Sequence, residues 1–394
     1  MPEVIQQHSS EPVGDEAFRR RQRARRRVQW SAQAVVVLAL VLFFWLLANN
    51  VSVNLAERNI RSGFGFLSGS AGFDIGEALI PFTSSDALWK AFANGMLNTI
   101  RVSLCAIVSA MVLGTVVGLM RLASHPVLRF LGAAHVEFYR NIPLIIQLFA
   151  VYMVLTELLP MSTEPLALGQ WALLSKAGLQ VAVPTQATLG AISAFGAALL
   201  TGLLVREIWR RRVTDLVAGL GGLGAGCVAA LCVWVLFGFV GGWSKPVVEG
   251  FSIEGGASLS PEFLALWLGL TMFTSAAIAE IVRAGVLAVG RGQWNAGAAL
   301  GLTQVQTISY IIFPQSMRLA IPPLASQFMN LTKNSSLAVV IGYPDLVAVG
   351  NSAINVTGQA LEAIVIIMAV YLVLNLIISV LMNGVNARVM RAPR

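Results

Sequence analysis

Eight long apolar segments constrain the fold of this chain more than any other feature. They lie at about 30–50, 95–121, 134–158, 189–207, 217–242, 262–288, 325–348 and 358–384. About 20 helical residues cross the roughly 30 Å hydrocarbon core of a bilayer. Only 12% of the residues are charged, against about 25% in a soluble domain. The sequence therefore predicts an all-α polytopic membrane protein with about eight transmembrane helices.

Basic residues are concentrated on one side of the predicted helices. Seven arginines lie in the N-terminal tail, residues 1–28, and loops on the same side carry more. The latter are Arg121, Arg129, Arg140, Arg206, Arg210, Arg211, Arg212, Arg291, Arg318, Arg388, Arg391 and Arg394. Cytoplasmic loops carry such an excess, so we expect both termini in the cytoplasm. The net charge of +8 then reflects orientation and contact with membrane lipid, and we expect no nucleic-acid partner.

The first apolar segment follows the basic tail, an order that secretory signal peptides share. It is longer than the apolar core of about 7–15 residues in such peptides. No small-residue cleavage pattern follows it cleanly. We therefore expect a retained first transmembrane helix, which forms, with the loop that follows, a unit over residues 29–94.

Several kinds of enzyme site lack their residues in this sequence. Cys105, Cys227 and Cys232 show no CxxC or Cys/His spacing, so neither a disulfide nor a zinc site is expected. A Walker lysine follows a glycine because the loop backbone wraps the phosphates, and none of the four lysines does so. We expect that the chain is not an enzyme, hydrolyses no ATP by itself and binds no cofactor or metal.

Lys333 is the most informative charged residue inside an apolar segment. It lies about nine residues into its span, or roughly 13 Å deep, where a charge costs about 2.5–3.5 kcal/mol or more. Asn330 lies one turn earlier, and Asn334, Ser335 and Ser336 adjoin it. One interpretation is a substrate path in which Lys333 pairs with a carboxylate of the solute. The other is a structural Lys–Glu pair within the bundle.

A polar stretch, residues 289–323, precedes the seventh span and is expected to be a loop. Its small residues from 296 to 301 predict a short helix with a smooth face. Gly301 would end this helix because glycine adopts positive φ at little cost. Such a helix fits a groove on another protein and transmits a push. Packing of a small-residue helix on its own bundle is the alternative, and both interpretations remain open.

Four motifs in matching order resemble the permeases of binding-protein-dependent ABC importers, in the branch that carries polar and general L-amino acids. Residues 137–148 resemble the pattern E-x-x-R-x-x-P-L-x-x-Q-L, residues 280–285 resemble E-x-x-R-G-G, and residues 327–337 resemble Q-F-x-x-x-x-K-D-(T/S)-S-L. Residues 289–315 resemble the EAA loop, which docks on the ATPase. Asn295 stands where glutamate is usual, and Gly297 stands where the second alanine is usual.

The resemblance and the helical spacing together suggest roles for individual residues. The residues expected to couple to the ATPase are Asn295, Ala296, Gly297, Ala299, Gly301 and Pro314. Glu280 and Arg283 lie on one helical face, which suggests a structural pair that orients this loop. Arg140 and Gln147 are expected to fix helix packing, and Pro143 is expected to kink or start its helix.

The resemblance also implies a division of the chain. It covers about 95–158 and 262–384, so residues 95–158 and 262–394 would form a five-helix permease core. Residues 159–261 would be an insertion with two transmembrane helices. The long N-terminus and this insertion resemble the larger Q-type permease of general L-amino-acid importers.

The resemblance implies a multi-pass subunit of the bacterial inner membrane that translocates amino acids. Its partners would be a second permease subunit, a cytoplasmic ABC ATPase dimer that uses ATP and Mg, and a periplasmic amino-acid-binding protein. A self-contained secondary transporter or channel for small polar solutes is the alternative. It explains the loop 289–315 poorly, and the sequence shows no clear inverted repeat of the kind many such carriers have.

Overall fold

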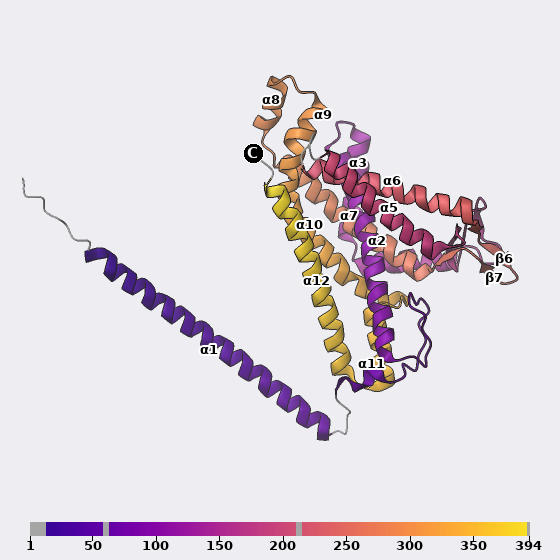
Figure 1. Ribbon diagram of the computed structural model, residues 1–394, viewed down its shortest axis with the longest axis horizontal. Helices are drawn as coiled ribbons and strands as arrows, with labels where there is room; N and C mark the ends of the chain where they lie inside the picture. Colours follow the sequence, from indigo (N-terminus) through magenta and orange to yellow (C-terminus); the bar gives the residue numbers. More distant parts are fainter. Residues whose placement is uncertain (1–12, 58–62, 210–214, 392–394) are drawn as a thin grey trace, which may run out of the picture. The chain divides into compact units, whose positions relative to one another are not determined.

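The structure is a computed structural model that describes residues 13–57, 63–209 and 215–391. The chain divides into two units, Met1–Phe64 and Gly65–Arg394, each described by itself. In the first unit, helix α1 (Val13–Glu57) contains a section, Gln29–Val51, that is long and apolar enough to cross a membrane (Figure 1). This section matches the predicted first span. The start of the predicted basic tail, residues 1–12, lies outside the described residues.

Among its described residues, the second unit contains five unbroken helices that are long and apolar enough to cross a membrane. They are α2 (Leu88–Leu122), α5 (Ala187–Trp209), α6 (Asp215–Gly241), α7 (Pro261–Leu287) and α12 (Ala360–Arg391). Because α2 begins at Leu88, the expected division between residues 94 and 95 falls inside it. With α1, the described residues hold six such helices, or eight if each of two bent helix pairs is one span. The predicted all-α polytopic fold is confirmed.

The first bent pair replaces the continuous span predicted at 134–158, and the prediction of continuity was wrong. α3 (Pro126–Asn141) and α4 (Leu144–Met153), which continues as the π-helical turn η2 (Val154–Leu158), meet at 104°. Ile142 is extended at the break, as residues before proline usually are. Pro143 is the N-cap of α4, so the prediction that Pro143 starts or kinks its helix is confirmed.

The second bent pair corrects the predicted loop 289–323 and the span expected to begin near residue 325. Helix begins much earlier, as α8 (Arg291–Ala299), α9 (Gln304–Thr307), η3 (Ile308–Ile312), α10 (Phe313–Asn334) and η4 (Ser335–Ile341). Pro314 sits in the first turn of α10, directly after the π-helical turn η3, and it lacks the N–H that would continue the helical hydrogen bonds there. The section Gln304–Ile341 then bends by 51° into α11 (Leu346–Thr357). The polarity of the early residues had suggested a loop, but polar residues on one face do not prevent a helix.

The core of the second unit lies where α2, α4, α7 and α10 meet. Its large buried side chains include Leu148, Leu266, Leu270, Leu331 and Tyr343. α2 and α7 approach closely because α2 places glycine at the contact. A Cβ at Gly114 would lie 2.7 Å from the Ile278 side chain, and one at Gly118 would lie 2.9 Å from the Ala279 oxygen. Small residues allow this approach between membrane helices.

The start of α7 is fixed locally by a capping group. The Ser260 side chain accepts a hydrogen bond from the Phe263 N–H, and Pro261 occupies the first helical position. Ser at the N-cap and Pro at the first position both favour a helix start. This cap determines where the chain leaves the preceding strand and enters the core.

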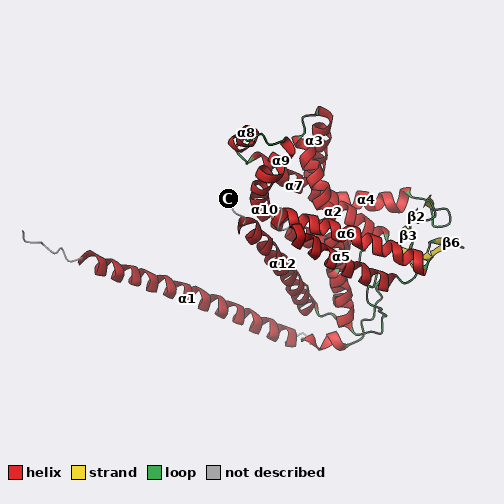
Figure 2. Ribbon diagram, turned by 45° about the horizontal axis from the view of Figure 1, so that its top comes forward, coloured by secondary structure: helices red, strands yellow, loops and turns green. Residues whose placement is uncertain are grey.

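The predicted insertion contains the hairpin α5–α6 and short strands in the two loops beside it. Gly222 and Gly226 of α6 pack against the backbone of Gly202 and Ala198 of α5. The strands are β1 (Leu166–Leu168), β2 (Ala172–Ser175), β3 (Gly178–Val181), β4 (Val183–Pro184), β5 (Trp243–Ser244), β6 (Val247–Glu249), β7 (Ser252–Glu254) and β8 (Ala257–Leu259). They lie at one end of the hairpin (Figure 2). Strands of two to four residues are too short for a reliable alternating pattern, and the sequence had predicted only two transmembrane helices for the insertion.

Antiparallel pairing of β3 with β8 joins the two loops of the insertion. The four-stranded sheet has the order β1-β2-β3-β8, with Leu179 opposite Leu259. Two smaller sheets pair β4 with β5 and β6 with β7. Because β8 leads directly into α7, this pairing ties the insertion to the core.

Candidate functional site

α8 forms the short helix that the sequence predicted within the loop 289–315. It begins at Arg291 and its last turn closes through bonds from the Gly301 N–H to the Ala298 oxygen and from the Leu302 N–H to the Gly297 oxygen. Gly301 has a φ of 71°, so it ends the helix in the left-handed region as expected. α8 and α9 lie together at one end of the unit (Figure 1).

The surroundings of Gly297 explain why glycine occupies a position at which the family usually has alanine. It is the buried residue of α8, and a Cβ there would lie 2.6 Å from Thr307 Cγ2 and 2.8 Å from Thr307 Oγ1. Thr307 is itself only 5% exposed, so it has little room to move. Glycine at 297 and threonine at 307 therefore form one close contact that seats α8 on α9.

Two further contacts hold α8 and α9 in place. The Thr303 side chain accepts from the Gln306 N–H while the Gln306 side chain accepts from the Thr303 N–H, which is a capping box. The Gln315 side-chain amide donates to Gln293 Oε1 at 3.3 Å and links α10 to α8. The start of α10 thus contacts α8 and helps to hold it in place.

The outward side of α8 and α9 exposes apolar side chains. Leu300 is 75% exposed and Val305 is 73% exposed. Asn295, Ala296 and Ala299 are exposed on α8 as well. Gly297 therefore serves the packing of α8 within this chain, which is one of the two interpretations of this helix. The exposed face of α8 is available for the other interpretation, contact with another protein.

Glu280 lies at the centre of an arginine cluster. Its carboxylate is 2.5 Å from Arg121 Nη1, 3.5 Å from Arg140 Nη1 and 3.3 Å from Arg283 Nε. The expected Glu280–Arg283 pair is present, and the structure adds Arg140 from another motif. Sequence reasoning missed Arg121, which comes from α2 and had counted only as a sign of orientation.

Gln147 stabilises the break between α3 and α4. Its buried side-chain amide donates to the backbone oxygens of Tyr139 and Ile142, both at 2.8 Å. Tyr139 lies in the last turn of α3 and Ile142 is its C-cap, where backbone carbonyls lack helical partners. Gln147 therefore joins α4 to the end of α3, in keeping with the helix-packing role expected from the sequence.

Lys333 and Asn330 lie on the exposed face of α10. The exposed positions of this helix recur every three or four residues: Leu319, Pro322, Pro323, Ser326, Asn330 and Lys333. The Lys333 ammonium makes no ion pair or hydrogen bond with any residue that the structure describes. The alternative of an internal Lys–Glu pair is therefore not found among those residues.

The neighbours of Lys333 divide into two groups. Ser335 is fully buried and its hydroxyl donates to the Thr332 oxygen. The Ser336 hydroxyl donates to the Lys333 oxygen, and Asn334 is half-buried. Both serine hydroxyls therefore bind backbone oxygens of α10, and of the four candidate residues around Lys333, Asn330 is the one on its exposed face.

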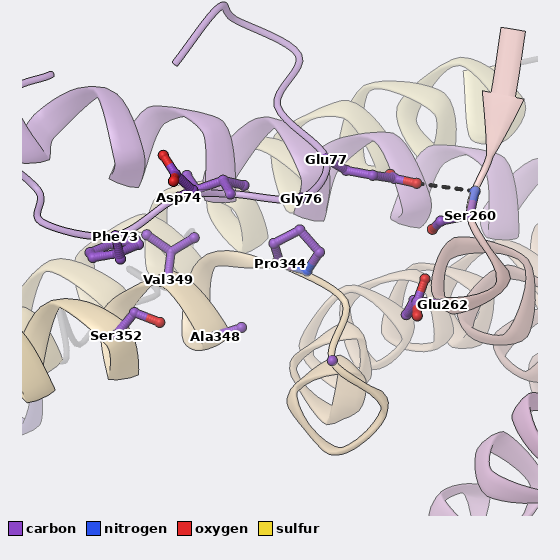
Figure 3. Close-up of a pocket in the computed structure, with 12 residues that line it drawn as sticks. Phe73, Asp74, Gly76, Glu77, Ser260, Glu262, Pro344, Ala348, Val349 and Ser352 are labelled. Atoms are coloured by element: carbon purple, nitrogen blue, oxygen red, sulfur yellow. Dashed lines mark hydrogen bonds between the residues drawn. The ribbon is translucent and has the colours of Figure 1, made fainter. Parts of the chain in front are cut away.

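A pocket of about 400 Å³ lies beside the N-terminal ends of α7 and α11. Figure 3 shows Asp74 and Glu77 on one side of it, with Ser260 and Glu262 at the start of α7 and Ser352 on α11. Three of these side chains are carboxylates. The pocket thus presents an acidic surface that the sequence did not reveal.

Glu77 ties the segment along this pocket to the helices beneath. Its carboxylate accepts from Arg101 Nη1 at 3.0 Å and from the Ser260 N–H at 3.2 Å, and its backbone oxygen accepts from Asn98. Asn94 binds the same segment through both backbone groups of Ile80. Polar residues at positions 94, 98 and 101 share one face of α2, which is the signal that sequence reasoning overlooked.

The loop before α2 has a titratable group outside the membrane-spanning helices. A hydrogen bond from Lys90 Nζ, at 2.7 Å, lowers the pKa of the Asp86 carboxyl below its usual value of 3.8. The Thr83 N–H also donates to this carboxylate at 3.0 Å. Asp86 therefore joins the turn to the first turn of α2.

Metal ligands do not gather in the part of the chain that the structure describes. No group of three or more His, Cys, Asp or Glu side chains there is arranged to hold an ion.

Comparison with known proteins gives a family and several relatives. Residues 110–391 match the family described as binding-protein-dependent transport system inner membrane component. The general L-amino acid transport system permease protein AapQ of Rhizobium johnstonii is 38% identical over 90% of this chain and 90% of its own length. The putative amino-acid ABC transporter permease protein YhdX of Escherichia coli is 40% identical over 91% of this chain and 93% of its own.

A third relative is similar over the same extent. The glutamate/glutamine/aspartate/asparagine transport system permease protein BztB of Rhodobacter capsulatus is 35% identical over 89% of this chain and 91% of its own length. In all three alignments about nine-tenths of both chains is covered. The insertion between α4 and α7 is too long to fall outside such alignments.

Proposed function

Because the chain belongs to the family of binding-protein-dependent transport system inner membrane components, we propose that it is the permease subunit of an ATP-driven importer of amino acids. The family match runs from α2 to α12, and it is the observation that carries the proposal. AapQ and YhdX are named as amino-acid permeases, and BztB is named for the transport of glutamate, glutamine, aspartate and asparagine. Amino acids are therefore the solute class we assign.

Coupling to the ATPase takes place through α8 and α9. Their exposed Leu300 and Val305 suit a groove on a partner, where apolar side chains are buried on association. Asn295 carries no charge, so the docked helix makes no ion pair through this position. The contact of Gly297 with Thr307 makes α8 and α9 move as one body, and Gln315 passes that motion to α10.

Translocation follows the exposed face of α10. A lysine facing lipid is costly, so Lys333 faces a wet path that a second permease subunit closes. An amino acid brings a carboxylate that pairs with the Lys333 ammonium, while Asn330 supplies amide groups from the same face. The hydroxyls of Ser335 and Ser336 bind the backbone, so these residues shape the wall of the path without contacting the solute through their hydroxyls. Asn334 lies at the edge of the path.

The complex has the composition that such importers share. A cytoplasmic ABC ATPase dimer supplies ATP hydrolysis with Mg, and a periplasmic binding protein delivers the amino acid. Both termini of this chain lie in the cytoplasm. Residues 95–158 and 262–394 then form the permease core with α8 on the cytoplasmic side, and the strands of the insertion 159–261 lie outside with the acidic pocket.

Co-purification tests the assignment of this chain as one subunit. A tagged chain expressed with its neighbouring genes and solubilised in mild detergent should retain a P-loop ATPase. Leu300→Asp should reduce the retained ATPase because it places a charge in the apolar contact. Phe251→Asp is a matched control, since Phe251 is 92% exposed at the β6–β7 turn on the opposite side. Transport by the chain alone, without ATP, would instead identify a secondary transporter.

A further inference from the structure

The exposed face of α10 continues past Lys333 onto η4. Side chains three residues apart lie in line on a 3-10 helix, and Ser336, Val339 and Gly342 follow Lys333 at this spacing. Ser336 is partly exposed, while Val339 and Gly342 are exposed. Gly342 also lines the acidic pocket beside α7 and α11. η4 is therefore the stretch of wall that joins the proposed solute path at Lys333 to this pocket.

The turn that follows η4 is held by α2. Asn98 Nδ2 donates to the Pro344 oxygen at 2.9 Å, and the Leu346 N–H donates to Thr99 Oγ1 at 3.1 Å. Close packing accompanies these bonds, since a Cβ at Gly95 would lie 3.0 Å from the Leu346 Cα. α2 therefore fixes the backbone just beyond the end of η4.

Asp345 is a fully buried carboxylate in this turn, and it forms no ion pair with a residue in the described ranges. Its Oδ1 accepts from the Ala348 N–H at 2.8 Å, which caps α11. Its Oδ2 accepts from the Tyr371 hydroxyl of α12 at 3.3 Å. Uncharged serine or asparagine would cap the helix as well, and a buried charge without a cation is costly. A cap alone thus does not account for the carboxylate, whereas a charged acceptor strengthens the bond from Tyr371.

Tyr371 also brings α12 to the start of η4. The hydroxyls of Ser335 and Thr99 lie beside the Tyr371 hydroxyl, and Ser335 is the first residue of η4. One tyrosine hydroxyl thus lies where α2, α11, α12 and η4 meet. The start of η4 at Ser335 and the turn beyond its end at Asp345 are therefore tied to the same point.

We propose that Asp345 and Tyr371 are a positioning pair that fixes η4 as the wall of the path between Lys333 and the acidic pocket. The pair touches no solute and acts through η4, and the proposal rests on the proposed translocation along α10. Without the bond between them, η4 loses its tie to α12. The wall then no longer keeps its place during the transport cycle, so less solute passes for each ATP hydrolysed.

The test uses the whole complex, with its partner subunits, in proteoliposomes. Hydrogen exchange of the amides in residues 335–348 measures the order of η4, and solute taken up per ATP hydrolysed measures its positioning. Tyr371→Phe removes one hydroxyl. It should accelerate this exchange about tenfold or more, the scale of one hydrogen bond to a charged group, and lower the uptake per ATP. A loss of folded complex alone would lower uptake and hydrolysis together and leave their ratio unchanged.

Two variants of Asp345 separate its two bonds. Asp345→Ser still caps α11 but is too short to reach Tyr371, so it should match Tyr371→Phe. The two changes together should be little worse than either one, because both break the same contact. Asp345→Asn keeps a cap and a polar group for the Tyr371 hydroxyl, and it should retain most of the wild-type uptake per ATP.

Thr357→Val is the matched control, since the Thr357 hydroxyl binds the Ala353 oxygen at the other end of α11. It should leave the exchange of η4 and the uptake per ATP unchanged. Wild-type exchange in Tyr371→Phe would overturn the proposal, and so would faster exchange with an unchanged uptake per ATP. Failure of the proposed function is distinguishable, because the wild-type complex would then show no ATP-driven uptake, while the exchange would still report whether the pair orders η4.

Discussion

Replacing Gly297 by alanine tests how α8 is seated. The added Cβ would lie 2.6 Å from Thr307 Cγ2 and 2.8 Å from Oγ1, both closer than real Cβ contacts. Overpacking of this kind costs about 1–3 kcal/mol, and the two short contacts with a buried partner place this site in the upper half of that range. Alanine recovers about 1 kcal/mol through its helix propensity.

The net loss in α8 docking is therefore about 1–2 kcal/mol, or roughly fivefold to thirtyfold in the ratio of docked to undocked helix. Hydrogen exchange of the amides in residues 291–312 measures this ratio in the assembled complex. ATP-driven uptake measures its consequence for coupling. Exchange should accelerate and uptake should fall, while ATP hydrolysis becomes less dependent on substrate.

A double variant separates this clash from other effects. Thr307→Ala removes both nearest atoms and leaves the residue 307 Cβ at 3.2 Å, so Gly297→Ala should be much less harmful in that background. Residues in contact show such coupling in a double-mutant cycle. Unchanged exchange in Gly297→Ala, or equal damage with and without Thr307→Ala, would refute the packing argument.

Three further predictions concern other parts of the molecule. Gly301→Leu should slow uptake more than Gly301→Asn. Nothing lies within 4 Å of a Cβ at this position, so the two variants differ mainly in the cost of the left-handed backbone, which is about 1–2 kcal/mol for leucine and less for asparagine. Equal uptake by the two variants would contradict this. Lys333→Met should impair uptake more than assembly, whereas Lys333→Arg should retain part of it; normal uptake kinetics in the methionine variant would remove Lys333 from the path. Lys90 lowers the pKa of Asp86, so the ionised Asp86 stabilises the turn before α2 at pH values above the usual pKa of 3.8, and this stabilisation is lost as the pH falls through the lowered pKa. Hydrogen exchange at the Thr83 amide should accelerate over that pH range. Lys90→Met should move the acceleration to higher pH, and an unchanged pH dependence would contradict this.

The spans were largely predictable because length and apolarity suffice to identify them. Gln29–Val51 and Ala187–Trp209 lie close to the predicted segments. The break at Ile142 was only partly predictable. Pro143 indicated a kink or helix start, but an angle of 104° depends on packing between α3, α4 and α7 rather than on local sequence.

The onset of α10 and the strands of the insertion show where local patterns fail. Polar residues from 304 to 323 suggested a loop, although their apolar neighbours face the core on one side of a helix. β3 and β8 pair across the α5–α6 hairpin, so their strand conformation depends on residues far apart in the sequence. Neither feature has a periodic signal of sufficient length.

The candidate residues divide in the same way. Gly301 was predictable because its conformational role is local. Arg121 was not, because Glu280 lies on another helix and no spacing rule connects α2 with α7. Glu77 was missed for a similar reason, since its partners Arg101 and Ser260 belong to separate elements.

Reconstituted uptake tests the central claim, that this chain is one subunit of an ATP-driven importer. Proteoliposomes would contain the whole complex, with labelled amino acid and its binding protein outside and ATP with Mg inside. The account predicts uptake that requires ATP and the binding protein, and that vesicles containing this chain alone lack. Uptake by this chain alone, without ATP or the binding protein, would contradict it.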